Sequence, residues 1–268
     1  MTHILDFEKV LTQKPEISGG KGWNLSRLKH YQFPIPDFRV IDSSACVLFF
    51  QYNNLKPAEK IDKMPESDRV GWLKELREMI LKAPLPPELE SELIQCLTET
   101  GWDRKPVSIR SSAPQEDSGK HSFAGIHDSF LNCIGLEQIR DGIRGGYASL
   151  WSPRAIAYRE KIGLDHREAS MGLVMMEMKD AEASGVAFTC NPHNGREDEL
   201  VIQAGPGLGE AIVSGQTDPD EYILDLRRYK QDIKSRRPGR HQAQTVLKSS
   251  GGVETLNPTT KGKPSLVF

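Results

Sequence analysis

The sequence predicts an α+β chain in two lobes, followed by a basic tail. Helical periodicity dominates the first third of its 268 residues, and short apolar runs separated by turn residues dominate from Met171 onward. Helices and strands that are segregated in this way along a chain are typical of α+β folds. We therefore expect a helical lobe over residues 1–105, a sheet-rich lobe over 106–226, and a basic hairpin with a loose end over 227–268.

Helices are expected where apolar residues recur at three- and four-residue steps. The positions are Val70, Leu73, Leu76 and Ile80, then Leu89, Leu93 and Leu97 after Pro86-Pro87, then Ile139, Ile143, Tyr147 and Leu150. A further helix is marked by its ends, because Ser152 can cap it, Pro153 fits its first turn and Gly163 suits its exit.

Strands are expected in two regions. Residues 107–109 and 130–134 flank a polar, glycine-containing loop over 111–125. Four later runs are expected to form strands of one sheet, joined by turns rich in Gly, Pro, Asn and Asp. These runs are 172–178, 185–189, 200–203 and 222–226.

The composition argues against several classes of protein. With 35 Lys and Arg against 37 Asp and Glu, the net charge of −2 gives no reason to expect binding to nucleic acid or a membrane surface. The N-terminus lacks the basic start and apolar run of a signal peptide, and no apolar stretch approaches the roughly 20 residues of a membrane span. The four cysteines are scattered without a CxxC pair, which favours reduced thiols in a cytoplasmic protein.

The tail is locally basic. Residues 227–240 carry seven Lys and Arg side chains and one acidic residue, Asp232. A solvated hairpin explains such a stretch, and a patch for RNA or another anionic partner is the alternative. We prefer the hairpin because Tyr229 is the one aromatic residue in the stretch, whereas nucleic-acid binding of this kind uses several stacking rings.

A glycine-rich segment, GGKGWNL, occupies residues 19–25 directly before an expected helix that continues through Leu28. Glycines let backbone N–H groups approach an anion closely, and a helix N-terminus adds positive potential. Lys21 then serves as a point charge beside phosphate oxygens. The alternative is an ordinary glycine-rich turn with a surface lysine, since the segment lacks the Walker spacing.

A second segment has an arginine and two serines where a strand meets a loop. Arg110, Ser111 and Ser112 place a guanidinium and two hydroxyls at this edge, and the planar fork of arginine suits a phosphate better than lysine does. The following loop is small and flexible enough to close over a triphosphate. The alternative for Arg110 is an ion pair with Glu116 or Asp117.

A third segment, QAGPGLGE, occupies residues 203–210 and is followed by VSG at 213–215 and PDEY at 219–222. Its glycines could let the backbone approach a nucleotide. A tight turn between a strand and a helix explains the same residues equally well.

Together these segments resemble the N-terminal nucleotide-binding domain of the pyruvate phosphate dikinase and phosphoenolpyruvate synthase family, which includes the rifampin phosphotransferases. The family patterns occur in the same order and at similar spacing, and the likeness extends to about residue 226. They are GGKxxxL at 19–25, VRSSAxxED…SFAG at 109–125, DxxLN at 128–132, SGVxFT at 184–189 and GLGExxVxG…PDEY at 207–222.

The resemblance implies an ATP-grasp fold that holds ATP between two lobes. It also implies phosphorylation of a histidine on a separate swivelling domain, which carries the phosphoryl group to pyruvate or another acceptor. Lys21 and Arg110 are expected to contact the phosphates and serve catalysis, with Mg²⁺ as the metal. The resemblance extends the nucleotide-binding set to Gly20, Ser111, Gly125, Gly207, Gly209 and Ser129, which replaces the threonine usual in relatives.

Two departures from the family pattern affect the expected chemistry. Met176 stands where many relatives have a glutamine near the nucleotide base. Methionine can pack on adenine but cannot form the hydrogen bonds of an amide. The selectivity for the base therefore stays open. Strand core is the alternative for the methionine run. By resemblance, the principal metal ligands are expected beyond Phe268, which leaves Glu210, with Asp220 and Glu221, as candidates.

None of the histidines at 121, 127, 166 and 193 lies in the TxGGxxxH pattern of a phosphocarrier. We therefore expect a partner that carries the phosphohistidine, or further C-terminal domains that do so. Three interpretations remain open: the ATP-binding part of a phosphoenolpyruvate synthase-like dikinase, the nucleotide-binding subunit of a split phosphotransferase such as a phenylphosphate synthase, and a non-catalytic nucleotide-binding module. In the first two, the isolated chain is expected to be inactive.

Overall fold

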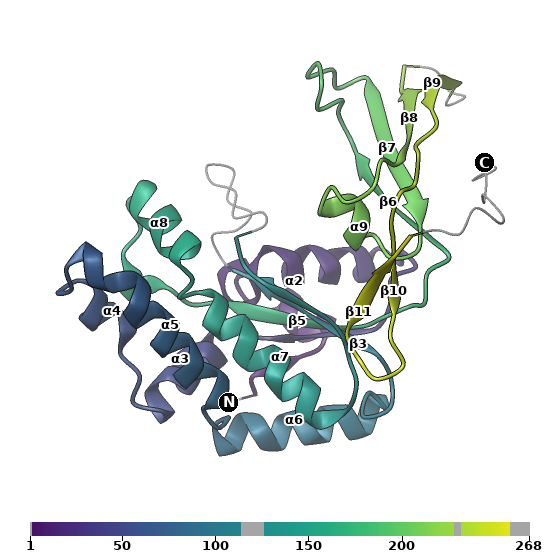
Figure 1. Ribbon diagram of the computed structural model, residues 1–268. Coiled ribbons are helices and arrows are strands. Elements are labelled where there is room, and N and C mark those ends of the chain that lie inside the picture. The colour runs from purple at the N-terminus through teal and green to yellow at the C-terminus, as the bar shows by residue number, and fades with distance from the viewer. Residues whose placement is uncertain (1, 114–125, 228–231, 258–268) are drawn as a thin grey trace. The chain divides into compact units, whose positions relative to one another are not determined.

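The computed structural model describes residues 2–113, 126–227 and 232–257 (Figure 1). The chain divides into two compact units, Met1–Met178 and Lys179–Phe268. The lobe boundary expected after residue 105 therefore falls inside the first unit. The reason is that strands before residue 105 and strands after it belong to one sheet, which joins the two predicted lobes.

The first unit contains a five-stranded sheet in the order β1-β2-β5-β3-β4. All four neighbouring pairs are antiparallel. The strands are β1 (Ile4–Leu5), β2 (Phe38–Ile41), β3 (Val107–Ser112), β4 (Ser129–Cys133) and β5 (Gly172–Glu177). The expected run at 172–178 is thus a strand, but it lies at the centre of this sheet and not with the later strands.

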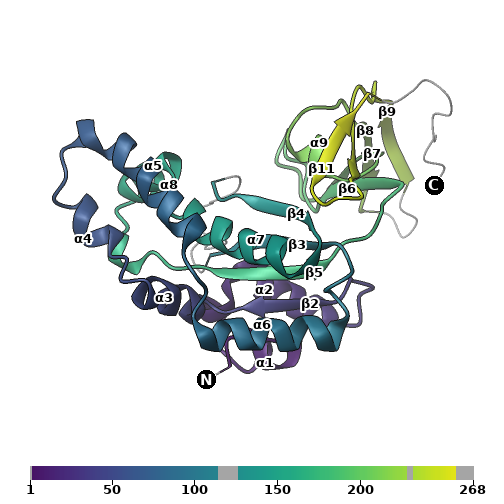
Figure 2. The same cartoon turned by 60° about the horizontal axis from the view of Figure 1, so that its bottom comes forward.

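Helices cover both faces of this sheet (Figures 1 and 2). One face carries α1 (Phe7–Leu11) and α2 (Pro15–His30), and α2 contacts β2, β3 and β5. The other face carries α7 (Gly135–Ser149), which packs on β3 and β4. The remaining helices of the unit are α3 (Ser43–Tyr52), α4 (Pro57–Ile61), α5 (Glu66–Lys82), α6 (Pro87–Thr100), α8 (Pro153–Lys161) and the short 3-10 helix η1 (His166–Glu168).

The expected helices form, with the predicted ends. The Ser152 hydroxyl accepts a hydrogen bond from the Ala155 amide at 3.2 Å, Pro153 occupies the first turn of α8, and Gly163 leaves it with φ +71°. The expected apolar faces of α5, α6 and α7 are buried, except that Val70 is 66% exposed. Local signals in the sequence were therefore enough to place these helices.

The second unit contains a four-stranded antiparallel sheet, β6-β7-β8-β9, and a two-stranded hairpin, β10-β11. The strands are β6 (Ala183–Phe188), β7 (Glu199–Pro206), β8 (Asp220–Asp225), β9 (Asp232–Arg237), β10 (Gln244–Leu247) and β11 (Val253–Leu256), with the short helix α9 (Glu210–Val213) after β7. Residues 253–256, which lie in the part of the chain where a loose end was expected, pair with β10.

The described basic side chains of the tail have acidic or aromatic neighbours. The guanidinium of Arg236 lies 5.4 Å from the Tyr222 ring, and four other basic residues pair with carboxylates: Arg227 with Asp225, Lys234 with Glu199, Arg237 with Glu221, and Arg240 with Asp218. These pairs favour the hairpin interpretation over an anion-binding patch. Every helix within the described ranges is too short or too polar to cross a membrane.

Candidate functional site

Gly19 divides α2 into two helical segments, 15–18 and 20–30. Its backbone has φ +69° and ψ 169°, a conformation that is essentially restricted to glycine. A Cβ atom at this position would lie 1.9 Å from the carbonyl oxygen of Ser112, so no side chain fits there. The first glycine of the GGK segment is therefore required by a turn and by close contact with strand β3.

The Ser112 hydroxyl holds the two segments of α2 together. It donates to the Ser18 carbonyl at 2.7 Å and accepts from the Gly22 amide at 3.0 Å, and its side chain is fully buried. The Gly22 amide belongs to the first turn of the second segment, where backbone donors have no partner within the helix. Ser112 thus supplies the N-terminal cap of that segment from a distant strand and fixes the backbone around Lys21.

The register of the sheet places several predicted residues on the face that carries α2. Arg110 is opposite Ser129 on β4 and Val174 on β5, while Ser108 is opposite Met176. Residues directly opposite each other in neighbouring strands share a face. Arg110 and Ser129 are exposed, and Met176 is half-buried against the cluster of Val40, Val174 and neighbouring residues under α2.

Ser111 points to the opposite face of the sheet from Arg110. Side chains alternate along a strand, and the β3–β5 register is regular from Val107 to Ser112. Ser111 is 4% exposed and opposite Leu173, which belongs to the main apolar core. The structure therefore places Arg110 and Ser112 on one face and leaves Ser111 on the core side, although the expected nucleotide-binding set contained Ser111 and not Ser112. Strand alternation was the signal that could have separated the two serines.

Positive charge is concentrated around the buried imidazole of His127. Burial lowers the pKa of His127 from 6.5 to about 4, assisted by the nearby charges of Arg159, Lys21 and Arg154. The Ser149 hydroxyl lies 3.5 Å from His127 Nδ1. Lys21 is thus one of three cations near His127, and burial is the larger cause of the lowered pKa.

In the second unit, the glycine segment forms the turn between β7 and α9. Gly207 has φ +75°, and a Cβ there would lie 2.5 Å from the Thr245 carbonyl oxygen. Gly209 is the N-cap residue of α9, where a Cβ would make only ordinary contact with Ser184. The strand-to-helix turn is therefore observed, and a role of Gly207 and Gly209 in binding a nucleotide stays a prediction.

The acidic candidates in this unit, Glu210, Asp220 and Glu221, do not gather into one group of metal ligands. Asp220 accepts from the Gly239 amide at 2.7 Å, and Glu221 accepts from the Gln203 amide at 3.0 Å. Glu210 is exposed on α9. Over the part of the chain that the structure describes, no group of three or more His, Cys, Asp or Glu side chains could hold a metal ion.

Several predicted features lie outside the described residues. They are Gly125, the possible Arg110 partners Glu116 and Asp117, the histidine at 121, and the end of the tail from residue 258. The other three histidines that were compared with the phosphocarrier pattern do not share a cluster: His127 precedes β4, His166 is in η1 and His193 follows β6.

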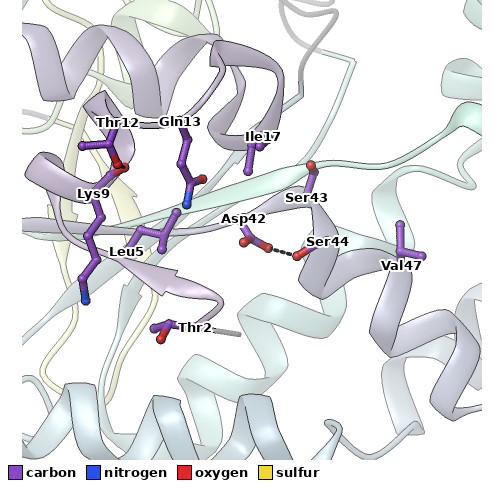
Figure 3. A pocket seen from close by; sticks show the side chains of 10 residues that line it. All are labelled: Thr2, Leu5, Lys9, Thr12, Gln13, Ile17, Asp42, Ser43, Ser44 and Val47. Atoms are coloured by element: carbon purple, nitrogen blue, oxygen red, sulfur yellow. Dashed lines mark hydrogen bonds between the residues drawn. The ribbon is translucent and has the colours of Figure 1, made fainter.

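A hollow of about 670 Å³ opens beside β1, the α1–α2 turn and the start of α3 (Figure 3). Its lining includes Lys9, Gln13 and Asp42, and the Ser44 hydroxyl donates to Asp42 at 2.6 Å. Lys21, Arg110, Ser129 and Met176 do not line it. This hollow is therefore separate from the residues that sequence reasoning selected.

The family assignment follows from comparison with known proteins. A family model described as pyruvate phosphate dikinase, AMP/ATP-binding domain, matches residues 15–266. The chain belongs to this family. As an AMP/ATP-binding domain of the family, it contains the GGK and RSS segments in the arrangement described above.

The curated relatives of this AMP/ATP-binding domain are phosphotransferases. A probable phosphoenolpyruvate synthase of Methanothermobacter thermautotrophicus is 35% identical over 83% of the chain and 34% of the relative. The phosphoenolpyruvate synthase of Aquifex aeolicus is 36% identical over 82% and 28%, and the rifampicin phosphotransferase of Bacillus cereus is 35% identical over 82% and 26%. The chain thus spans about a third or less of the length of these relatives.

Proposed function

We propose that the chain is the ATP-binding part of a phosphoenolpyruvate synthase-like dikinase with an ATP-grasp fold. In this proposal, ATP phosphorylates a carrier histidine on another domain, which passes the phosphoryl group to pyruvate or another acceptor. The observation that carries the proposal is the contact of Ser112 with Gly22, which fixes the Lys21 backbone beside the face that carries Arg110. Family membership and the phosphotransferase relatives support it.

The proposed chemistry of this site is the positioning of phosphates. Lys21 provides a point charge and Arg110 a planar pair of donors, while the N-terminus of the second α2 segment adds positive potential. Phosphoryl transfer needs mainly positioning and neutralisation of charge, so these groups suit the task. In this proposal, Ser129 and Met176 line the neighbouring part of the nucleotide site, and their position on the same face as Arg110 supports this role.

Calorimetric titration with ATP, with and without Mg²⁺, tests the proposal. Lys21→Ala and Arg110→Ala should each weaken binding by about 1.5–3 kcal/mol, the usual scale for a hydrogen bond to a charged group. Lys9→Ala, in the hollow of Figure 3, is the matched control and should bind ATP like the parent. Unchanged ATP affinity in both site variants would contradict the assignment of these residues.

The isolated chain should bind ATP with little turnover. Catalysis of phosphoryl transfer depends on Mg²⁺ held by carboxylates together with the phosphates, and the part of the chain that the structure describes contains no group of three or more His, Cys, Asp or Glu side chains that could hold the ion by themselves. A coupled assay for release of AMP and phosphate measures turnover directly. Robust turnover by the purified chain would show that a complete metal site exists within its 268 residues.

The second candidate is a nucleotide-binding subunit of a split phosphotransferase, such as a phenylphosphate synthase. It is compatible with the match of the AMP/ATP-binding domain model to residues 15–266. Adding a separately expressed phosphohistidine domain distinguishes the possibilities, since a split enzyme regains turnover in trans. A chain that binds ATP but never regains turnover is instead a non-catalytic binding module.

A further inference from the structure

A second hollow, of about 510 Å³, is lined by residues of α3, α4 and η1 and by the segments beside them. Its lining includes Phe50, Leu55, Ala58, Trp151 and Ala169, which belong to the main apolar core of the first unit or pack against it. The Phe50 and Trp151 rings meet edge to face with their centres 6.2 Å apart. A hollow of this size with a largely apolar lining is typical of a small-molecule site.

Trp151 brings a buried hydrogen-bond donor to this lining. The residue is 2% exposed, and its Nε1 has no hydrogen-bond partner within the described part of the chain. A buried donor that stays unpaired lowers stability, and such groups are rare in folded proteins. An acceptor on a bound molecule would supply the missing partner.

His166 is the second buried polar side chain of the lining, at 7% exposed. Its Nδ1 accepts from Arg159 Nε at 3.2 Å, so the neutral ring carries its proton on Nε2. This Nε2 lies 3.6 Å from a carboxylate oxygen of Glu160, which is longer than a normal hydrogen bond, and the same oxygen accepts from Arg69 at 2.7 Å. The buried polar side chains of the lining therefore offer donors to a ligand.

The charges of the lining favour an anion over a cation. The charged side chains are Lys56, Arg167 and Glu59, and His166 stays neutral near pH 7 because burial lowers its pKa. The lining thus carries one positive charge in excess. The excess is modest, since Lys56 pairs with Glu59, and Arg167 pairs with Asp62 outside the lining. A negatively charged acceptor matches both this charge and the buried donors.

We propose that this hollow binds a small aromatic carboxylate, with the ring against Phe50 and Trp151 and the carboxylate accepting a hydrogen bond from Trp151 Nε1. A carboxylate has acceptor oxygens and no donor, which suits a lining whose buried polar side chains donate. The ring suits the apolar lining because aromatic groups pack favourably edge to face. None of the described residues proposed for the nucleotide site lines this hollow, so binding here does not depend on the proposed ATP-binding function.

Titration of the parent chain with benzoate, toluene and acetate, followed by NMR, tests the proposal. Benzoate combines a ring with a carboxylate, whereas toluene lacks the acceptor and acetate lacks the ring. Benzoate should bind on the order of tenfold more tightly than either of them. It should also move the indole N–H signal of Trp151 downfield, as formation of a hydrogen bond does, and toluene should not.

Three results with the parent chain would overturn the proposal. They are no saturable binding of benzoate, toluene binding as tightly as benzoate, and acetate binding as tightly as benzoate. The second result would indicate a purely apolar hollow, and the third an unspecific attraction of anions. None of these measurements requires a variant that folds.

Trp151→Phe separates the donor from the ring. It keeps an aromatic side chain but removes the N–H, so benzoate affinity should fall on the order of tenfold while toluene affinity stays unchanged. Trp72→Phe is the matched control, because Trp72 belongs to the same unit but does not line this hollow, and it should change neither affinity. Unchanged benzoate affinity in a folded Trp151→Phe would contradict the role of Nε1.

Titrations with ATP separate the two proposals. A chain that binds benzoate but not ATP would reject the proposed function alone. A chain that binds ATP but not benzoate would reject the aromatic carboxylate site alone.

Discussion

Replacement of Gly19 by alanine is the sharpest test of the phosphate end of the site. The backbone of Gly19, at φ +69° and ψ 169°, is one that alanine rarely adopts, and the added Cβ would lie 1.9 Å from the Ser112 carbonyl oxygen. Because the obstacle is backbone of the central sheet, a change of rotamer cannot relieve it. The first segment of α2 or the end of β3 has to move, and either movement breaks the contacts of the Ser112 hydroxyl.

The size of the effect follows from its components. Forcing alanine into this region costs about 1–3 kcal/mol, and loss of the two hydrogen bonds of Ser112 costs a further ~1–3 kcal/mol. The expected loss of stability for Gly19→Ala is therefore about 4 kcal/mol, or roughly 8–16 °C in the melting temperature of a unit of this size. Affinity for ATP should fall in parallel, since Lys21 lies two residues further along the chain.

Urea denaturation followed by tryptophan fluorescence provides the assay. All four tryptophans, at positions 23, 72, 102 and 151, belong to the first unit, so the signal reports on that unit. Gly71→Ala is the control, because a Cβ on α5 at this position meets no atom within 4 Å. It should stabilise the helix by about 0.5–1 kcal/mol. A Gly19→Ala variant within about 1 kcal/mol of the parent would refute the close contact of α2 with β3.

Three further predictions concern single side chains. Ser112→Ala removes the hydroxyl that caps Gly22 and should destabilise the first unit by about 1–3 kcal/mol in the same assay; a neutral result would mean that the cap is dispensable. Met176→Gln should raise the ratio of ATP to GTP affinity, measured by calorimetry, if residue 176 lines the base, and an unchanged ratio would assign it to the core. Hydrogen bonds from Lys234 and then Asn191 lower the pKa of Glu199 from 4.5 to about 2, so its stabilising contribution should be complete above pH 4.5 and lost as pH falls toward 2. In Lys234→Met, hydrogen exchange of β7 peptides should show this loss at a higher pH than in the parent. Identical acid profiles of the variant and the parent would contradict the pairing of Lys234 with Glu199.

Features specified by local chemistry could be predicted from the sequence. The ends of α8 follow from Ser152, Pro153 and Gly163, and each has the predicted role in the structure. The start of α6 follows from the Pro86-Pro87 pair, and its apolar face is buried as expected. These signals act over a few residues, so no knowledge of the rest of the chain was needed.

Features that depend on distant partners could not be predicted in this way. The run at 172–177 has the same apolar character as the later strands, yet it pairs with β2 and β3. Periodicity identifies a strand but does not identify its neighbours. The division of α2 at Gly19 is of the same kind, because it results from contact with Ser112, 93 residues further along the chain.

The RSS triplet shows how one strand serves both the core and the proposed site. Because side chains alternate, Arg110 and Ser112 reach the α2 face while Ser111 enters the core on the α7 side. A slip of one residue in the β3 register would exchange these faces, burying the guanidinium among apolar groups and removing the cap from Gly22. Stable packing of Val107 and Ile109, both fully buried, therefore also determines which way Arg110 points. The register that stabilises the sheet thus also positions Arg110 and Ser112, the serine that orders the Lys21 backbone. A change in this strand that disturbs the packing of the sheet should therefore disturb the proposed site as well.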